Sequence, residues 1–162
     1  MKKDLELKRK IKGLIILFII LLVLSGITAF PIESELSFLL KHSSSFPVSL
    51  KHWLSKIYLE VKKTNTDFPH LSYGTDWLAF AHIVIATAFI GPLIDPVKNI
   101  WVIQFGMIAC IMVFPLALIA GTIRQIPFFW QLIDCSFGVL GVIFLYITYK
   151  NIRKLEIQNK YA

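Results

Sequence analysis

Four long apolar blocks constrain this chain more than any other feature. They occupy residues 14–30, 77–93, 100–123 and 128–149. A helix needs about 20 mostly apolar residues to cross the roughly 30 Å hydrocarbon core of a bilayer, so each block can span it, the second with little tilt. Because backbone polar groups find no water inside a bilayer, such blocks form helices. The sequence therefore predicts an all-α integral membrane protein with four transmembrane helices.

Composition and charge exclude several other classes of protein. The chain is 56% hydrophobic with a formal net charge of +7, and its basic residues flank the apolar blocks. That arrangement is typical of membrane topology signals, so we expect the lipid bilayer as a partner and no nucleic acid. Cys110 and Cys135 both lie inside apolar blocks, with no CxxC motif and no metal-ligand spacing. We therefore expect neither a metal site nor a disulfide framework.

The first block permits two interpretations. Its basic start and Ala29 fit a cleaved signal peptide, whereas its apolar run is longer than the usual signal core and lacks the second small residue of a cleavage site. We favour an uncleaved anchor, and cleavage stays open as the alternative.

The distribution of lysine and arginine predicts the orientation. Residues 1–13, the turn at 95–99 and the tail at 150–162 hold eleven of the 17 basic residues and four of the ten acidic ones. Cytoplasmic loops carry the excess of basic residues. We therefore expect a cytoplasmic basic N-terminus, a cytoplasmic basic tail and, with four spans, both termini on the same side.

The segment at 31–76 is the sizeable stretch outside the predicted spans. Within it, residues from about 48 to 63 have a helical period, with one apolar face made of Leu50, Trp53, Leu54, Ile57 and Val61. Basic residues cover the rest, which favours an amphipathic helix lying in the outer membrane interface. A shorter helix is expected near residues 33–41.

Two turn signals mark the expected starts of spans. Thr75 is a candidate N-cap for the second span. Asp95 and Pro96 fit the N-cap and first position of the third span, which begins after the "GPLIDPVKN" break. Pro115 should kink the third span, because it removes a backbone donor and frees the carbonyl of Ile111.

Asp134 lies inside the fourth block, where an isolated carboxylate would cost about 3 kcal/mol. It shares a helix face with glycines, and the third block has a matching small-residue stripe that continues to Arg124. Small residues let helices approach closely. The residues expected to pack the third and fourth helices are Gly106, Ala117, Gly121, Gly138 and Gly141. We expect Arg124 and Asp134 to form an ion pair between these antiparallel helices.

His82 lies at a similar predicted depth in the second block, so His82, Arg124 and Asp134 form a candidate intramembrane polar cluster. The cluster has two interpretations. It is either a structural clasp between helices or the site of a membrane enzyme or transporter, in which His82 exchanges protons. A third hypothesis, a haem or quinone protein using His82, also stays open, so enzyme activity and cofactors are unknown from the sequence.

Three runs, "YGTDWLAFAHI", "GPLIDPVKNIWVIQFGMIAC" and "IPFFWQLIDCSFG", resemble an uncharacterised group of small four-span bacterial membrane proteins. The resemblance covers about the last two-thirds of the chain and implies the bacterial inner membrane. It implies no activity, ligand or site residue. The expected function is that of a small multi-pass inner-membrane protein acting through helix packing, as a homo-oligomer or as an accessory subunit of a membrane partner protein.

Overall fold

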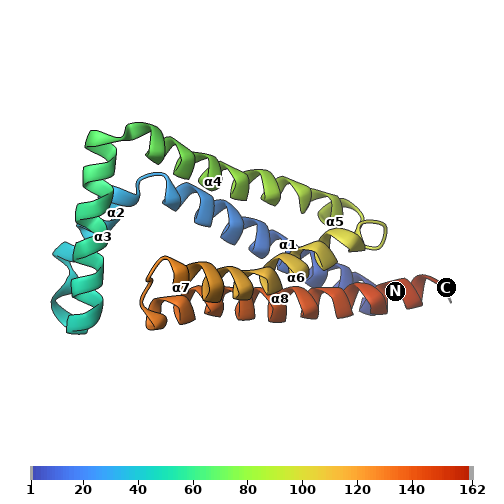
Figure 1. The fold of residues 1–162 in the computed structure, drawn as a ribbon. Coiled ribbons are helices and arrows are strands. Elements are labelled where there is room, and N and C mark those ends of the chain that lie inside the picture. Colours follow the sequence, from blue (N-terminus) through green and yellow to red (C-terminus); the bar gives the residue numbers. More distant parts are fainter. Residues whose placement is uncertain (1, 161–162) are drawn as a thin grey trace. The chain divides into compact units, whose positions relative to one another are not determined.

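The computed structural model describes residues 2–160, and the described chain is helical with no strand. Its longer helices are α1 (Lys2–Ala29), α2 (Ile32–Lys41), α3 (Val48–Asp67), α4 (Pro69–Ala88), α6 (Ile100–Pro115) and α8 (Phe128–Lys160). The shorter elements are η1 (Ser43–Ser45), α5 (Ile90–Ile94), the π-helical segment η2 (Leu116–Ala120) and α7 (Gly121–Ile123), as Figure 1 shows in part. The predicted all-α class is confirmed.

Four stretches are long and apolar enough to cross a membrane: Leu5–Ala29, Pro69–Ile94, Ile100–Ile123 and Phe128–Lys160. They correspond to the four predicted blocks, so the chain is a multi-pass membrane protein. Large apolar side chains remain exposed along all four, among them Leu21, Leu24, Leu78, Ile108, Ile119, Phe137 and Leu140. Exposed apolar side chains are what a bilayer requires, because lipid tails solvate them.

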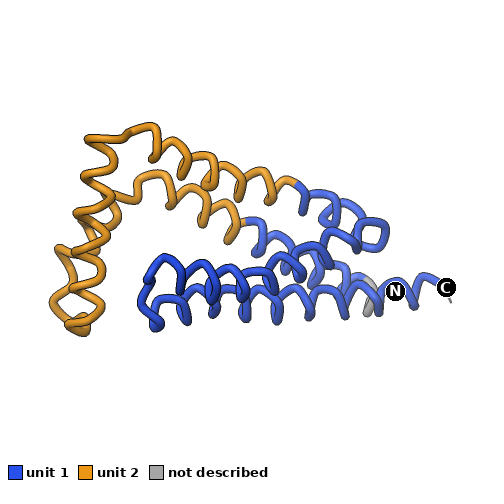
Figure 2. Tube along the Cα trace, in the orientation of Figure 1, with its two compact units in different colours: residues 1–19, 88–162 blue, residues 20–87 orange. Residues whose placement is uncertain are grey.

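The chain forms two compact units (Figure 2). The first contains residues up to Ile19 together with those from Ala88 onward, and the second contains Ile20–Thr87. The middle of α1 and the last residue of α4 therefore mark the boundaries. We describe each unit by itself.

The first unit is built around α6 and α8, which run antiparallel and pack along their length (Figure 1). Glycines make this packing close. A Cβ added at Gly138 would lie 2.8 Å from the carbonyl oxygen of Cys110, and one at Gly141 would lie 2.5 Å from the Cys110 Sγ. Real Cβ atoms essentially never come within 3.0 Å of another atom, so a side chain at position 138 would require the backbone to shift, and one at position 141 would require the Cys110 side chain to move.

The N-terminal part of α1 completes the core of the first unit. Ile11 and Ile15 are buried, and the Phe18 ring lies 4.7 Å from that of Phe89 and 6.2 Å from that of Phe144, measured between centroids. The buried apolar side chains of this unit are Ile11, Ile15, Phe89, Ile103, Cys135, Leu145, Ile152 and Leu155. Aromatic and branched side chains thus fill the space between the helices.

Regular α-helix in the third span ends at Pro115. The π-helical segment η2 follows it directly and leads into α7. Proline has no N–H to donate to the carbonyl of Ile111, so the hydrogen-bond pattern changes register at this point. The predicted stretch at 100–123 remains helical throughout.

In the second unit, α2 packs against α3, and their contact buries Leu36 and Leu54. The predicted amphipathic helix is present as Val48–Asp67, and its apolar face is the covered one. The second half of α1 approaches α4 closely, because a Cβ at Gly26 would lie 2.7 Å from the carbonyl oxygen of Ala79. This third glycine contact did not belong to the predicted set.

Two predicted helix starts are wrong. The helix of the second span begins at Pro69, so Thr75 lies inside it and is not a cap. Residues 96–99 form a turn, so Pro96 is not the first residue of the third helix, which starts at Ile100. The predicted tail at 150–162 is helical to Lys160, while its last two residues lie outside the described part. Hydropathy locates the lipid-exposed stretch of a helix, and polar residues continue the helix beyond it.

Candidate functional site

The connection from α7 to α8 shapes one end of the first unit. Arg124 caps α7, and Gln125 has a positive φ of 58°. The N–H of Ile126 donates to the carbonyl of Gly121 at 2.9 Å, and that of Gln125 donates to Thr122 at 3.1 Å. These bonds are those of a helix that ends in a left-handed residue, which reverses the chain within a few residues. The tight reversal places Arg124 beside the first turns of α8.

A groove of about 290 Å³ lies at this reversal. Arg124 and Asp134 both line it, and apolar and small residues make up the rest: Val113, Leu116, Ala117, Ala120, Gly121 and Ile126. Three of these belong to the π-helical segment η2. Segments of π-helix occur frequently at functional sites, because they reorient side chains within an otherwise regular helix. We call this cavity the Arg124–Asp134 groove.

The predicted direct ion pair is not formed. Among the side chains that the structure describes, neither Arg124 nor Asp134 has an oppositely charged partner within 4.0 Å. Arg124 is exposed and Asp134 is partly exposed. The groove is therefore lined by one cation and one anion that no salt bridge neutralises.

Gln131 lies next to this groove. Its side chain fills the space left by the small residues of the third span. It is 4% exposed, and its Nε2 donates to the carbonyl of Ile126 at 2.8 Å. A Cβ at Gly121 would lie 2.9 Å from the Gln131 side chain. A buried amide with a satisfied donor fixes the reversal against α8. Helical spacing alone does not predict this role of Gln131.

The other packing residues serve contacts within the chain. Gly106 faces the side chains of Leu145 and Phe89, at 2.8 and 2.9 Å from a would-be Cβ, and Ala117 lines the groove. All four predicted glycines are therefore occupied by neighbours within the first unit. They are not available as a surface for a second helix.

His82 belongs to the second unit, so the predicted three-residue cluster stays a prediction. Its Nδ1 lies 2.9 Å from the carbonyl oxygen of Leu78. Because a carbonyl can only accept, Nδ1 carries the proton and a neutral ring would keep Nε2 as its acceptor. No group of three metal-ligating side chains occurs among the described residues.

A polar network in the second unit escaped the sequence analysis. Asn65 donates from Nδ2 to the Glu33 carboxylate at 2.6 Å, and the Ser72 hydroxyl donates to the Asn65 carbonyl. These bonds connect α2, α3 and α4 beside a cavity of about 300 Å³, which Glu60 and Asp76 also line. Polar residues between the predicted helices show no periodic pattern in the sequence. Their spacing alone therefore could not predict these hydrogen bonds.

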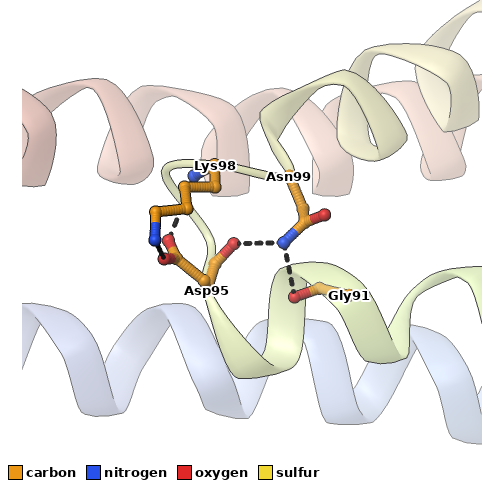
Figure 3. Close-up of polar contacts among 4 residues, drawn as sticks. All are labelled: Gly91, Asp95, Lys98 and Asn99. Atoms are coloured by element: carbon orange, nitrogen blue, oxygen red, sulfur yellow. Dashed lines mark hydrogen bonds and ion pairs between the residues drawn. The ribbon is translucent and has the colours of Figure 1, made fainter.

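The turn between α5 and α6 is held by side chains (Figure 3). Asp95 accepts the backbone N–H of Lys98 at 3.0 Å, and its carboxylate lies 3.5 Å from the Lys98 ammonium. Asn99 donates from Nδ2 to the carbonyls of Gly91 and Asp95, at 3.1 and 2.9 Å. The hydrogen bond from the Lys98 N–H is the main cause that lowers the pKa of Asp95, and the Lys98 charge adds to it.

In a comparison with known proteins, no protein family, curated protein or solved structure matches the chain.

Proposed function

We propose that this protein is a small multi-pass protein of the bacterial inner membrane that acts through helix packing as a homo-oligomer, with both termini in the cytoplasm. The observation that carries the proposal is the Arg124–Asp134 groove, where two opposite charges line one cavity without pairing. A carboxylate at this depth costs about 3 kcal/mol unless a partner compensates it. A second copy of the chain offers such a partner.

The two charges suit a symmetric contact. In a two-fold dimer, residue i of one copy meets residue j of the other, and the reverse contact occurs at the same time. Arg124 of one copy would then pair with Asp134 of the second copy, and Asp134 of the first with Arg124 of the second. One surface carrying both signs is therefore complementary to itself. The glycine seam is used within the chain, so this groove is the better candidate interface.

Charge reversal tests this pairing. Arg124→Asp leaves two anions in each groove and Asp134→Arg leaves two cations, so each variant alone should repel its own copies. When the two variants are co-expressed with different tags, every contact between unlike copies pairs an anion with a cation. Native mass spectrometry in detergent should find wild-type dimers, monomers of either variant alone, and mixed dimers from co-expression.

Lys63→Asp provides the control, because Lys63 is exposed on α3 and does not line the groove. It should dimerise as the wild type does. Circular dichroism would establish that each variant keeps its helix content. A monomeric wild type would refute the proposed homo-oligomer and favour an accessory subunit. A single variant that dimerises normally would exclude the reciprocal Arg124–Asp134 pair.

A further inference from the structure

A second groove lies at the opposite end of α6 and α8 from the Arg124–Asp134 groove. It has a volume of about 500 Å³, and three segments of the first unit line it: Lys8 and Lys12 from α1, the turn from Ile94 to Lys98, and Leu155 and Asn159 from α8. We call it the basic groove. From the sequence, the lysines of this groove are only topology signals, because the three segments are distant in the sequence.

The charges of the basic groove do not cancel. Its three cations are Lys8, Lys12 and Lys98, and its single anion is Asp95. Asp95 already accepts the Lys98 backbone N–H and lies 3.5 Å from the Lys98 ammonium. Lys8 and Lys12 form no ion pair within the part of the chain whose side chains the structure describes. Two exposed ammonium groups thus remain available to an anion.

The position of the groove matches the level of lipid headgroups. Lys12 comes two residues before the apolar run of the first span, and Lys98 comes two residues before the start of α6. Lysine side chains at such boundaries extend toward the polar surface of the membrane. Ile94, beside them, is 77% exposed and offers an apolar contact at the same edge. Basic pockets between transmembrane helices are suited to anionic headgroups.

We infer that the basic groove binds the phosphate headgroup of an anionic phospholipid. Lys8 and Lys12 contact the phosphate, Asn159 donates to a headgroup oxygen, and an acyl chain runs past Ile94. Asp95 does not bind the lipid; it holds Lys98 at the rim. The inference is independent of the proposed dimer contact, because the two grooves share no residue.

Native mass spectrometry of the detergent-purified full chain with added phosphatidylglycerol tests the inference. Each lysine near a headgroup contributes about a fivefold change in affinity, so Lys8→Gln/Lys12→Gln should weaken phosphatidylglycerol binding by about twenty- to thirtyfold. Arg9→Gln/Lys10→Gln removes the same charge from exposed positions of the same helix outside the groove. This matched control should bind within about twofold of the wild type.

Three results would overturn the inference. Equal loss in both double variants would mean general electrostatic attraction rather than this groove. Equal binding of zwitterionic phosphatidylcholine would remove the charge requirement. Displacement of phosphatidylglycerol by millimolar inorganic phosphate would reassign the groove to a soluble phosphate.

Discussion

At the residue scale, the close crossing of α6 and α8 depends on glycine, because glycine has no side chain. The carbonyl of Cys110 occupies the space in which a side chain at position 138 would begin. Backbone touches backbone at this point, so no rotamer change can make room. Dispersion contacts at such crossings replace the hydrophobic effect, which is absent between helices within a lipid environment.

Gly138→Ala should therefore lower the thermal stability in detergent, by roughly 1–3 kcal/mol, because the added methyl forces the two helices apart. Gly13→Ala is the matched change, since Gly13 lies within α1 and nothing lies within 4 Å of its would-be Cβ. It should be neutral or stabilise by up to about 1 kcal/mol, because alanine favours helix. Circular dichroism melts compare the two, and equal effects would refute the close crossing.

The candidate site was partly predictable from residues alone. Helical spacing correctly brought Arg124 and Asp134 to one place, since a short connection forces neighbouring helices to pack antiparallel. It failed on their pairing, because the side-chain direction of Arg124 depends on how α7 ends. The left-handed Gln125 sets that ending, and no sequence pattern marks a glutamine for this conformation.

At the element scale, the turn from Ile94 to Ile100 depends on a carboxylate. The Lys98 N–H and the Lys98 charge lower the pKa of Asp95 in the folded protein. A lowered folded pKa means that Asp95 contributes stability above the unfolded carboxyl pKa of about 3.9, and that this contribution is lost as the pH falls through the folded value. The stabilising contribution of Asp95 is therefore lost in acidic solution and not at neutral pH.

Asp95→Asn should consequently be slightly less stable than the wild type at pH 7, with a difference that shrinks below about pH 4. The effect is small, because the carboxylate is exposed to solvent screening. Thermal melts of both proteins across a pH series measure it. A difference that grows toward acid would show that the charge of Asp95 does not stabilise the turn.

At this scale, the sequence predicts which segments form helices, but it does not predict how long those helices are. Apolar run length located all four spans, because the bilayer imposes a minimum. It missed the first turns of α4 and the extension of α8, where polar residues remain helical outside the lipid. In α8 a signal was present: Ile152 and Leu155 recur at helical spacing in the basic tail, and both are buried.

At the scale of the whole molecule, the distribution of charge predicts how the spans are oriented in the bilayer. Basic residues gather at the start of α1, in the turn before α6 and at the end of α8. A chain that crosses four times is expected to have these three regions on one side of the membrane. The same topology predicts the segment at 31–76, whose acidic and basic residues balance, on the other side. Membrane insertion follows the lysine and arginine bias of short loops, so the basic side should be cytoplasmic.

We therefore expect green fluorescent protein fused to either end of the chain to fluoresce in bacterial cells, because it matures in the cytoplasm. Alkaline phosphatase, which folds only after export, should be active when fused after Asp67 and inactive when fused after Lys160. Asp67 ends α3 in the outer segment, so this fusion is the internal control for export. An active phosphatase at the C-terminal end together with a fluorescent N-terminal fusion would require an odd number of spans. The second block would then be the first candidate for the span that does not cross, because it is one of the two shortest predicted blocks and is divided at Phe89 into two helices. A chain that fails to cross there would leave the basic turn at Lys98 and the basic end of α8 on the outer side, opposite to the basic N-terminus, against the charge bias that predicts all three on one side.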